Sequence, residues 1–206
     1  MQTIILVNRA RVAALHGETA ATQLMGKLDA LAAHSDVQGE VIRLDENDTV
    51  SAAYAAWTSD LNDVDKANHV AAAIRGVVMT YLQEHDSVEY IVLVGDDRLL
   101  PFRRIPDNTP RTDYLERDYA YVDSDHPTGA ALRANYFLTD DYYADREPTS
   151  FSGRELYIPD LAVGRLVETP DEIIDFIDAF LADPQVTLGK VLVTGYDIIY
   201  FWVARM

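Results

Sequence analysis

The sequence contains no cysteine among its 206 residues. This absence excludes disulfide bonds, zinc–thiolate sites and any cysteine nucleophile from the chain. The signatures of other common chemistries are missing too, because no G-x-S-x-G elbow, P-loop or G-x-G-x-x-G turn occurs. The histidines at His16, His34, His69, His85 and His126 have no metal-ligand spacing with one another. Taken alone, these residues make up no complete catalytic constellation.

Long apolar segments and basic charge are also scarce. No apolar run approaches the roughly 18 residues that a transmembrane helix needs. The first residues, MQTIILVNRA, lack the basic start of a signal peptide, which favours a first strand and a cytoplasmic location. The 17 basic residues face 34 acidic ones, giving a formal charge of −17. That charge disfavours nucleic acid and anionic membranes as partners, and it is compatible with cationic substrates or divalent cations.

Strand-like and helix-like segments alternate over the first 94 residues. Apolar runs predict strands over Ile4–Asn8, Glu40–Leu44 and Tyr90–Val94, and helical spacing predicts helices over Ala20–Ala33, Val50–Trp57 and Asp65–Glu84. The last helix is expected to pack its core face with Val70, Ile74, Val77, Val78 and Tyr81. The order predicts an α/β fold: a three-layer, mostly parallel, doubly wound sheet, in one domain over residues 1–206.

Residues 101–153 interrupt this regularity. The stretch is rich in Pro, Asp, Arg and Tyr and shows little periodicity. Its apolar bulk is aromatic, supplied by Tyr114, Tyr119, Tyr121, Tyr136, Phe137, Tyr142 and Tyr143. We interpret it as an excursion held down by packed aromatic side chains. Long ordered insertions are often functional, and walling a substrate cleft is one such role.

Regular elements are predicted again after this stretch. A short strand is expected over Leu161–Val163, and another over Lys190–Thr194. Between them Thr169 is predicted to cap a helix that has Pro170 at its first position. The core stripe of that helix is expected to be Ile173, Ile174, Ile177 and Phe180.

Two groups of carboxylates are candidate sites. Asp96 and Asp97 follow the predicted strand Tyr90–Val94, at the sheet edge where ligands gather. They are placed to bind a hard cation or a basic group; alternatively, one caps the next turn and the other is solvated. Asp140, Asp141 and Asp145 form an acidic cluster that either holds calcium or is an ordinary loop, since its spacing is not that of an EF-hand.

Three arginines are the cationic counterparts of these carboxylates. In so acidic a chain, Arg103, Arg104 and Arg165 are expected to pair with carboxylates. A buried Arg–Asp pair would lock the loop that follows the strand Tyr90–Val94.

An ordered series of motifs resembles the gingipain family of cysteine peptidases, which share the caspase-like fold. The series comprises YIVLVGDDRLLPFRRIPD (Tyr90–Asp107), YFLTDDYYADREP (Tyr136–Pro148) and LYIPDLAVGRLVETPDEIIDFIDAFL (Leu156–Leu181). KVLVTGYD (Lys190–Asp197) then looks like the strand that begins the catalytic portion of such proteins. Residues 1–86 fit this family by architecture alone.

The resemblance implies a peptidase portion without its catalytic residues. Family members carry a catalytic His in a Gly-His-Gly loop and a nucleophilic Cys at a later strand end, and neither is found before Met206. Without the thiolate no acyl-enzyme forms. We therefore expect the N-terminal, non-catalytic part of an enzyme that acts on peptides or proteins, as a natural or experimental truncation. The family's bound calcium ions suggest Asp96, Asp140, Asp141 or Asp145 as ligands.

Other interpretations remain. The chain is alternatively a non-enzymatic binding module whose acidic cleft takes calcium or a cationic peptide. A hydrolase using only carboxylates is disfavoured, because no recognised scaffold places a pair of them. The apolar segment Ile198–Val203 is expected to be covered by homo-oligomerisation or to form a last buried element.

Overall fold

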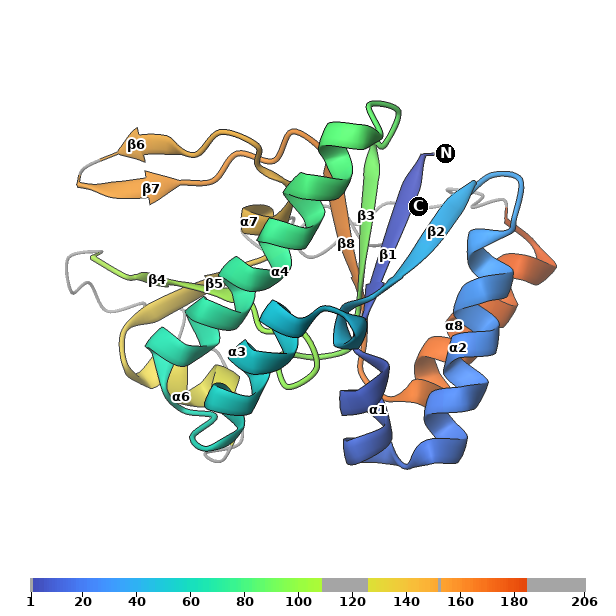
Figure 1. Cartoon of the computed structure of the whole chain (residues 1–206), viewed down its shortest axis with the longest axis horizontal. Coiled ribbons are helices and arrows are strands. Elements are labelled where there is room, and N and C mark those ends of the chain that lie inside the picture. Colours follow the sequence, from blue (N-terminus) through green and yellow to red (C-terminus); the bar gives the residue numbers. More distant parts are fainter. Residues whose placement is uncertain (1, 109–125, 152, 185–206) are drawn as a thin grey trace, which may run out of the picture.

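The structure is a computed structural model that describes residues 2–108, 126–151 and 153–184 (Figure 1). The predicted strand Lys190–Thr194, the apolar segment Ile198–Val203 and three tyrosines (Tyr114, Tyr119 and Tyr121) lie outside the described residues. None of the helices within the described ranges is both long and apolar enough to cross a membrane.

Helices and strands alternate up to residue 94, as the sequence predicts. The elements are β1 (Thr3–Val7), α1 (Arg9–His16), α2 (Glu18–Ala32), β2 (Gly39–Arg43), the 3-10 turn η1 (Leu44–Glu46), α3 (Asp48–Thr58), α4 (Val64–Glu84) and β3 (Tyr90–Val94). The later elements are β4 (Arg103–Pro106), α6 (Pro127–Arg133), β5 (Tyr136–Thr139), α7 (Asp141–Ala144), β6 (Thr149–Phe151), β7 (Arg154–Leu156), β8 (Ala162–Leu166) and α8 (Pro170–Ala182).

The centre of the molecule is a parallel sheet with the strand order β2-β1-β3-β8. β1 is buried along its whole length, and β3 is buried from Ile91 to Val94. Continuous apolar strands of this kind are typical of parallel sheets that are covered on both faces. The fold is therefore the predicted α/β, three-layer arrangement.

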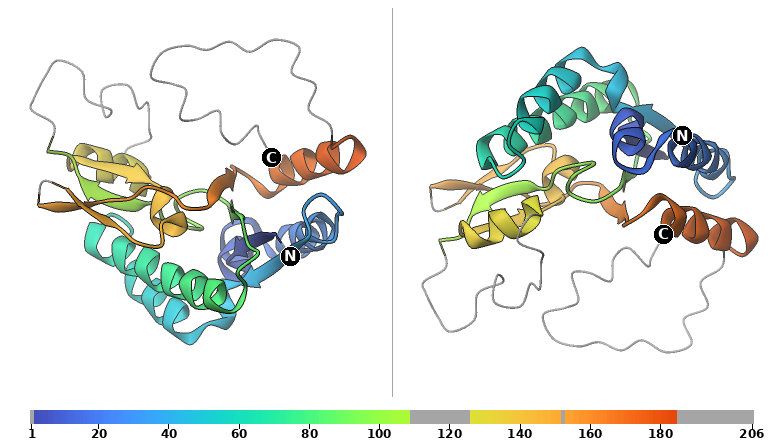
Figure 2. Two further views of the ribbon diagram at one scale, coloured as in Figure 1. Left: turned by 90° about the horizontal axis from the view of Figure 1, so that it is seen from above. Right: turned by 90° about the horizontal axis from the view of Figure 1, so that it is seen from below.

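Helices cover both faces of this sheet (Figures 1 and 2). α2 and α8 lie together on one side, where Lys27 pairs with Asp178 and the rings of His34 and Phe180 form a T-shaped contact. α3 and α4 lie together on the other side, with Trp57 fully buried. Because the strands are parallel, the carboxyl ends of β1, β3 and β8 meet at one edge of the sheet.

The stretch after residue 100 has more regular structure than its composition suggests. β4 and β5 form an antiparallel ribbon, and β6 and β7 form a hairpin. Strands of three or four residues contain too few positions for a periodicity to be recognised. The aromatic packing is confirmed for Tyr142 and Tyr143, which are buried, whereas Tyr136 and Phe137 are half-buried.

Some helical details differ from the prediction. α1 is not predicted, because it is short and Val12 is its one buried residue. On α4, Val77 and Tyr81 are half-buried rather than buried, since Ala67, Ala71 and Leu82 share the core face instead.

The helix over Pro170–Ala182 begins as predicted. Thr169 accepts from the N–H of Glu172, whose side chain bonds back to Thr169, forming a capping box. The core stripe is narrower than expected: Ile173 and Ile177 are buried, whereas Ile174 and Phe180 are half-buried.

Candidate functional site

The candidate site lies where β3 ends, at the carboxyl edge of the sheet. The N–H of Gly95 donates to Leu166 on β8 (2.7 Å), and the chain then turns sharply. Gly95 has a φ of +102°, and a Cβ at this position would lie 2.3 Å from Cδ1 of Leu99. Only glycine fits this close approach in the left-handed region. The turn aims Asp96 and Asp97 away from the strand and into contact with neighbouring elements.

Asp97 forms a fully buried ion pair with Arg104 on β4. Their Oδ2 and Nη2 atoms are 2.7 Å apart, and each side chain is only 1% exposed. Asp97 also accepts from the N–H of Phe102 (2.9 Å) and the hydroxyl of Thr128 (3.0 Å). Asn68 on α4 holds the backbone of Arg104 by two hydrogen bonds. The predicted Arg–Asp pair that holds the loop after β3 is thus present. The interpretation of Asp97 as solvated is wrong, because Arg104 compensates the burial of its charge.

A second ion pair, between the buried Arg165 and the partly buried Asp140, joins β8 to the acidic cluster. Arg165 binds Asp140 through two parallel hydrogen bonds, of 2.9 and 2.5 Å. Its Nη1 donates to the carbonyls of Gly95 and Leu100, both at 2.8 Å, and its guanidinium lies 4.1 Å from the ring centre of Phe102. Burial acts to lower the pKa of Arg165, but the Asp140 carboxylate raises it above its ordinary value. This arginine therefore stays charged and ties β8 to the loop after β3 and to the turn before α7.

The side chain of Asp96 is 13% exposed and is held by Arg98 and His126. Its Oδ1 accepts from the N–H groups of Arg98 and Leu99, so it caps the turn, and its Oδ2 accepts from Nε of Arg98 (2.7 Å). Nε2 of His126 lies 3.5 Å from Oδ2. Burial opposes the shift, yet hydrogen bonds from His126 and Arg98 hold the pKa of Asp96 well below its usual range.

His126 is engaged at both ring nitrogens. Nδ1 accepts from the N–H of Thr128 at the start of α6 (3.3 Å), which assigns the proton of the neutral ring to Nε2, the atom facing Asp96. A general base needs a free lone pair aimed at its substrate. His126 is thus an N-cap and a partner of Asp96, and the sequence signal for this role is the proline that follows it, Pro127.

The other predicted ligands of calcium lie in α7 or beside it. Asp145 is buried and accepts from the N–H of Ile158 (2.6 Å). Burial, followed by the charges of Asp140 and Asp145, raises the pKa of Asp141. Over residues 2–108, 126–151 and 153–184, no three His, Asp or Glu side chains are grouped so as to hold a metal ion. The described carboxylates therefore do not fit a common ligand set, and calcium binding stays a prediction.

Sequence reasoning misses the supporting residues of this edge. Tyr54 on α3 donates its hydroxyl to the carbonyl of Leu99 (2.6 Å), and Tyr143 donates to that of Pro101. Burial raises the pKa of both phenols. Neither contact has a local signal, since each spans more than forty residues of sequence. The loop after β3 is consequently fixed from α3, α4, α7 and β8 at once.

The arrangement defines a class of protein, an α/β protein with the caspase-like, three-layer fold. At the edge where its parallel strands end, the charged side chains pair with one another, as Asp97–Arg104 and Asp140–Arg165. The family model of peptidase family C25 matches residues 20–187. The chain belongs to this family, the gingipain family of cysteine peptidases. The match begins within α2 and so includes helices that resemble the family by architecture alone. No curated protein and no solved structure matches the chain.

Proposed function

We propose that these residues form the non-catalytic portion of a gingipain-like cysteine peptidase, without peptidase activity of their own. The observation that carries the proposal is the combination of the C25 match over residues 20–187 with the complete absence of cysteine. Peptide hydrolysis in this family needs a thiolate nucleophile activated by histidine. The chain supplies the sheet and its stabilising ion pairs, while the nucleophile has to come from residues outside this sequence.

The contacts at the carboxyl edge support a structural role for it. Arg104 and Arg165 are buried, and carboxylates and carbonyl oxygens satisfy them. Asp97 accepts from an arginine, a hydroxyl and a backbone N–H, which are the donors that a buried carboxylate needs. Groups so fully occupied are poorly placed to bind and activate a substrate.

A peptidase assay on the chain tests the proposal. The purified protein is incubated with a fluorescent protein substrate and a mixed peptide pool, with and without reductant. We expect no hydrolysis above a blank purified in the same way. The matched control is the Asp96→Asn variant, because the side chain of Asp96 is 13% exposed, whereas that of Asp97 at the same edge is 1% exposed.

Hydrolysis that copurifies with the wild-type chain and disappears in Asp96→Asn would overturn the proposal. A second test is genetic. We expect the reading frame, or a gene expressed with it, to encode a Gly-His-Gly loop and a strand-end cysteine on the same fold; their absence would remove the peptidase assignment.

A further inference from the structure

Four arginines at one end of the molecule have no ion pair among the described residues, although the chain carries a net charge of −17. They are Arg75 on α4, Arg103 on β4, Arg146 before β6 and Arg154 on β7. Most other described cations are paired: Arg9 with Glu18, Lys27 with Asp178, Arg43 with Glu46, Lys66 with Asp63, Arg98 with Asp96, Arg104 with Asp97 and Arg165 with Asp140. Arg11 on α1 likewise has no ion pair among the described residues, but these four lie together near the β6–β7 hairpin.

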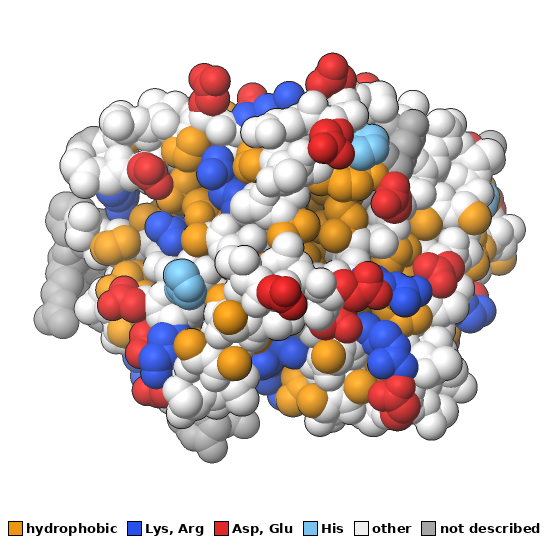
Figure 3. Space-filling view, in the orientation of Figure 1, with side chains coloured by type: hydrophobic (Ala, Val, Ile, Leu, Met, Phe, Trp, Pro, Cys, Tyr) orange, Lys and Arg blue, Asp and Glu red, His pale blue; other side chains and the backbone are white. Residues whose placement is uncertain are grey.

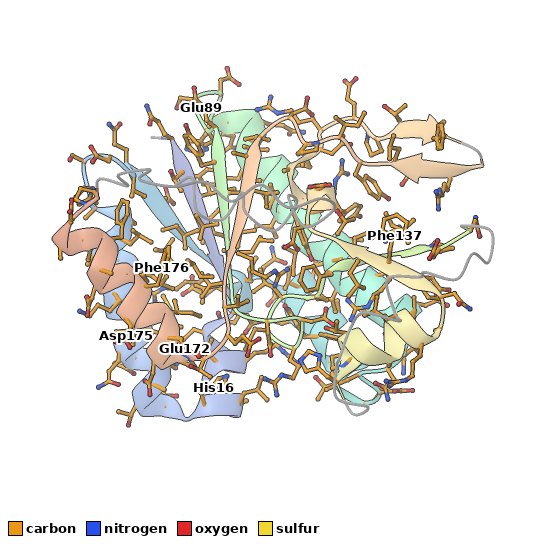
Figure 4. The ribbon with its side chains drawn as sticks, turned by 180° about the vertical axis from the view of Figure 1, so that it is seen from behind. His16, Glu89, Phe137, Glu172, Asp175 and Phe176 are labelled. Atoms are coloured by element: carbon orange, nitrogen blue, oxygen red, sulfur yellow. The ribbon has the colours of Figure 1, made fainter. Side chains whose placement is uncertain are left out.

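Aromatic rings and backbone carbonyls hold three of these arginines, Arg75, Arg103 and Arg154, in place without neutralising them. The guanidinium carbons of Arg75 and Arg103 lie 5.2 and 4.7 Å from the ring centre of Tyr142. Arg154 donates to the carbonyl of Pro106 (2.8 Å) and lies 5.7 Å from the ring centre of Phe137. Phe137, on β5, is labelled in Figure 4. Ordered cations without counter-charges are placed to receive carboxylates from a partner.

Arg103 also has an unmet donor. Its Nε is buried and has no hydrogen-bond partner among the described atoms. Buried donors without an acceptor are rare and costly in native proteins. A small shift of this side chain toward an external carboxylate would satisfy the donor.

Exposed apolar side chains lie directly beside these cations. Phe151, Leu156 and Ile158 are 54%, 42% and 58% exposed. Phe151 stands opposite Arg154 in the register of the β6–β7 hairpin. Figure 3 shows basic side chains among hydrophobic ones on the left of the molecule, over this end. We call these four arginines and three apolar residues the hairpin surface.

The hairpin also offers unpaired backbone. β6 and β7 pair only with each other among the described strands, so each has one edge of free N–H and C=O groups. All residues of β6 are exposed. Figure 1 shows the β6–β7 hairpin at the edge of the molecule. An isolated two-stranded hairpin is marginally stable and gains from a third strand.

We propose that the hairpin surface binds an extended, acidic polypeptide segment in which carboxylates alternate with apolar side chains. The segment adds to the hairpin as a strand, its carboxylates pair with Arg103, Arg146 and Arg154, and its apolar side chains cover Phe151, Leu156 and Ile158. A nucleic acid fits less well, because it brings no aliphatic side chains to cover Phe151, Leu156 and Ile158. This inference does not depend on the function proposed above, which has a separate assay.

Fluorescence anisotropy with a labelled peptide of alternating Glu and Leu tests the proposal on the whole chain. We expect saturable binding, weakened roughly tenfold by Arg146→Glu/Arg154→Glu, which reverses two of the cations. Phe151→Ser/Ile158→Ser is expected to weaken binding about fivefold. Thermal melting of each variant verifies that it is folded. If Arg154→Glu unfolds the chain, Arg146→Glu/Ile158→Ser replaces it, since both side chains are exposed.

Matched controls lie on the opposite side of the chain's structure. Arg43→Glu removes an exposed arginine of β2, and Phe176→Ser removes a half-exposed aromatic of α8. We expect neither to change the affinity by more than about twofold. A peptide of alternating Lys and Leu is expected not to bind.

Four outcomes would overturn the proposal. They are absence of binding at millimolar peptide, equal weakening by Arg43→Glu, equal affinity for the Lys-Leu peptide, and equal affinity for an oligothymidylate. Sedimentation of the free protein adds a fifth. A dimer that Arg146→Glu/Arg154→Glu dissociates would assign the surface to a second copy of this chain instead.

Discussion

Asp97 and Arg104 illustrate what a buried ion pair contributes in this protein. Removing one partner leaves an uncompensated charge in the interior, which typically costs about 3–5 kcal/mol, whereas removing both costs less. We expect Arg104→Met to lower the free energy of unfolding by that amount. The double variant Asp97→Asn/Arg104→Met should recover part of the loss. Urea denaturation of both single variants and the double variant measures the coupling.

The exposed ion pair Arg43–Glu46 is the control for this comparison of single and double variants. Their side chains are 42% and 70% exposed, so replacing both with alanine is expected to change the unfolding free energy by less than about 1 kcal/mol. Strictly additive effects at Asp97 and Arg104 would show that the two charges do not interact.

Asp96 gives the protein an acid-sensitive contact. Hydrogen bonds from His126 and Arg98 depress the pKa of Asp96 in the folded state, so its contribution is complete above the ordinary carboxyl pKa. It is lost as the pH falls toward the depressed value. We expect Asp96→Asn to cost about 1–3 kcal/mol at pH 7. Denaturation between pH 7 and pH 2 should show this difference shrinking below about pH 4. A difference independent of pH would contradict this account.

At the scale of the element, α8 depends on its capping box. The side chains of Thr169 and Glu172 accept from each other's backbone N–H groups at the start of this helix, which packs against α2. We expect Thr169→Ala to destabilise the protein by about 1 kcal/mol. Hydrogen exchange should accelerate in the first turn of α8. Thr149→Ala, at an exposed position of β6, is the control; equal acceleration in both variants would argue against a specific cap.

The elements also show how far local sequence information reaches. β3 is predicted at its observed bounds because Tyr90–Val94 is an uninterrupted apolar run between polar turns. The Thr169–Pro170 start of α8 is predicted equally well, since a cap is a local interaction. β4 to β7 are missed because three or four residues carry no period, and α1 is missed because it buries almost nothing.

The whole molecule carries a charge of −17, which makes self-repulsion part of its stability. We expect the melting temperature to rise as NaCl screens this repulsion. CaCl₂ at matched ionic strength, with MgCl₂ as control, then tests the calcium prediction for Asp96, Asp140, Asp141 and Asp145. A bound ion adds stabilisation beyond screening. Identical curves for the three salts, together with no heat in a calcium titration, would remove the prediction.

The sequence by itself determined the class of fold and the chemistry that this chain lacks. Apolar runs and helical spacing are properties of short stretches of sequence, and the absence of cysteine is read directly from the composition. Only the tertiary structure decided which charges meet. Asp97 is buried against Arg104, and Asp140 is bound by Arg165 from a strand 25 residues away. Burial and partner are set by packing between distant elements, so no local pattern of residues encodes them.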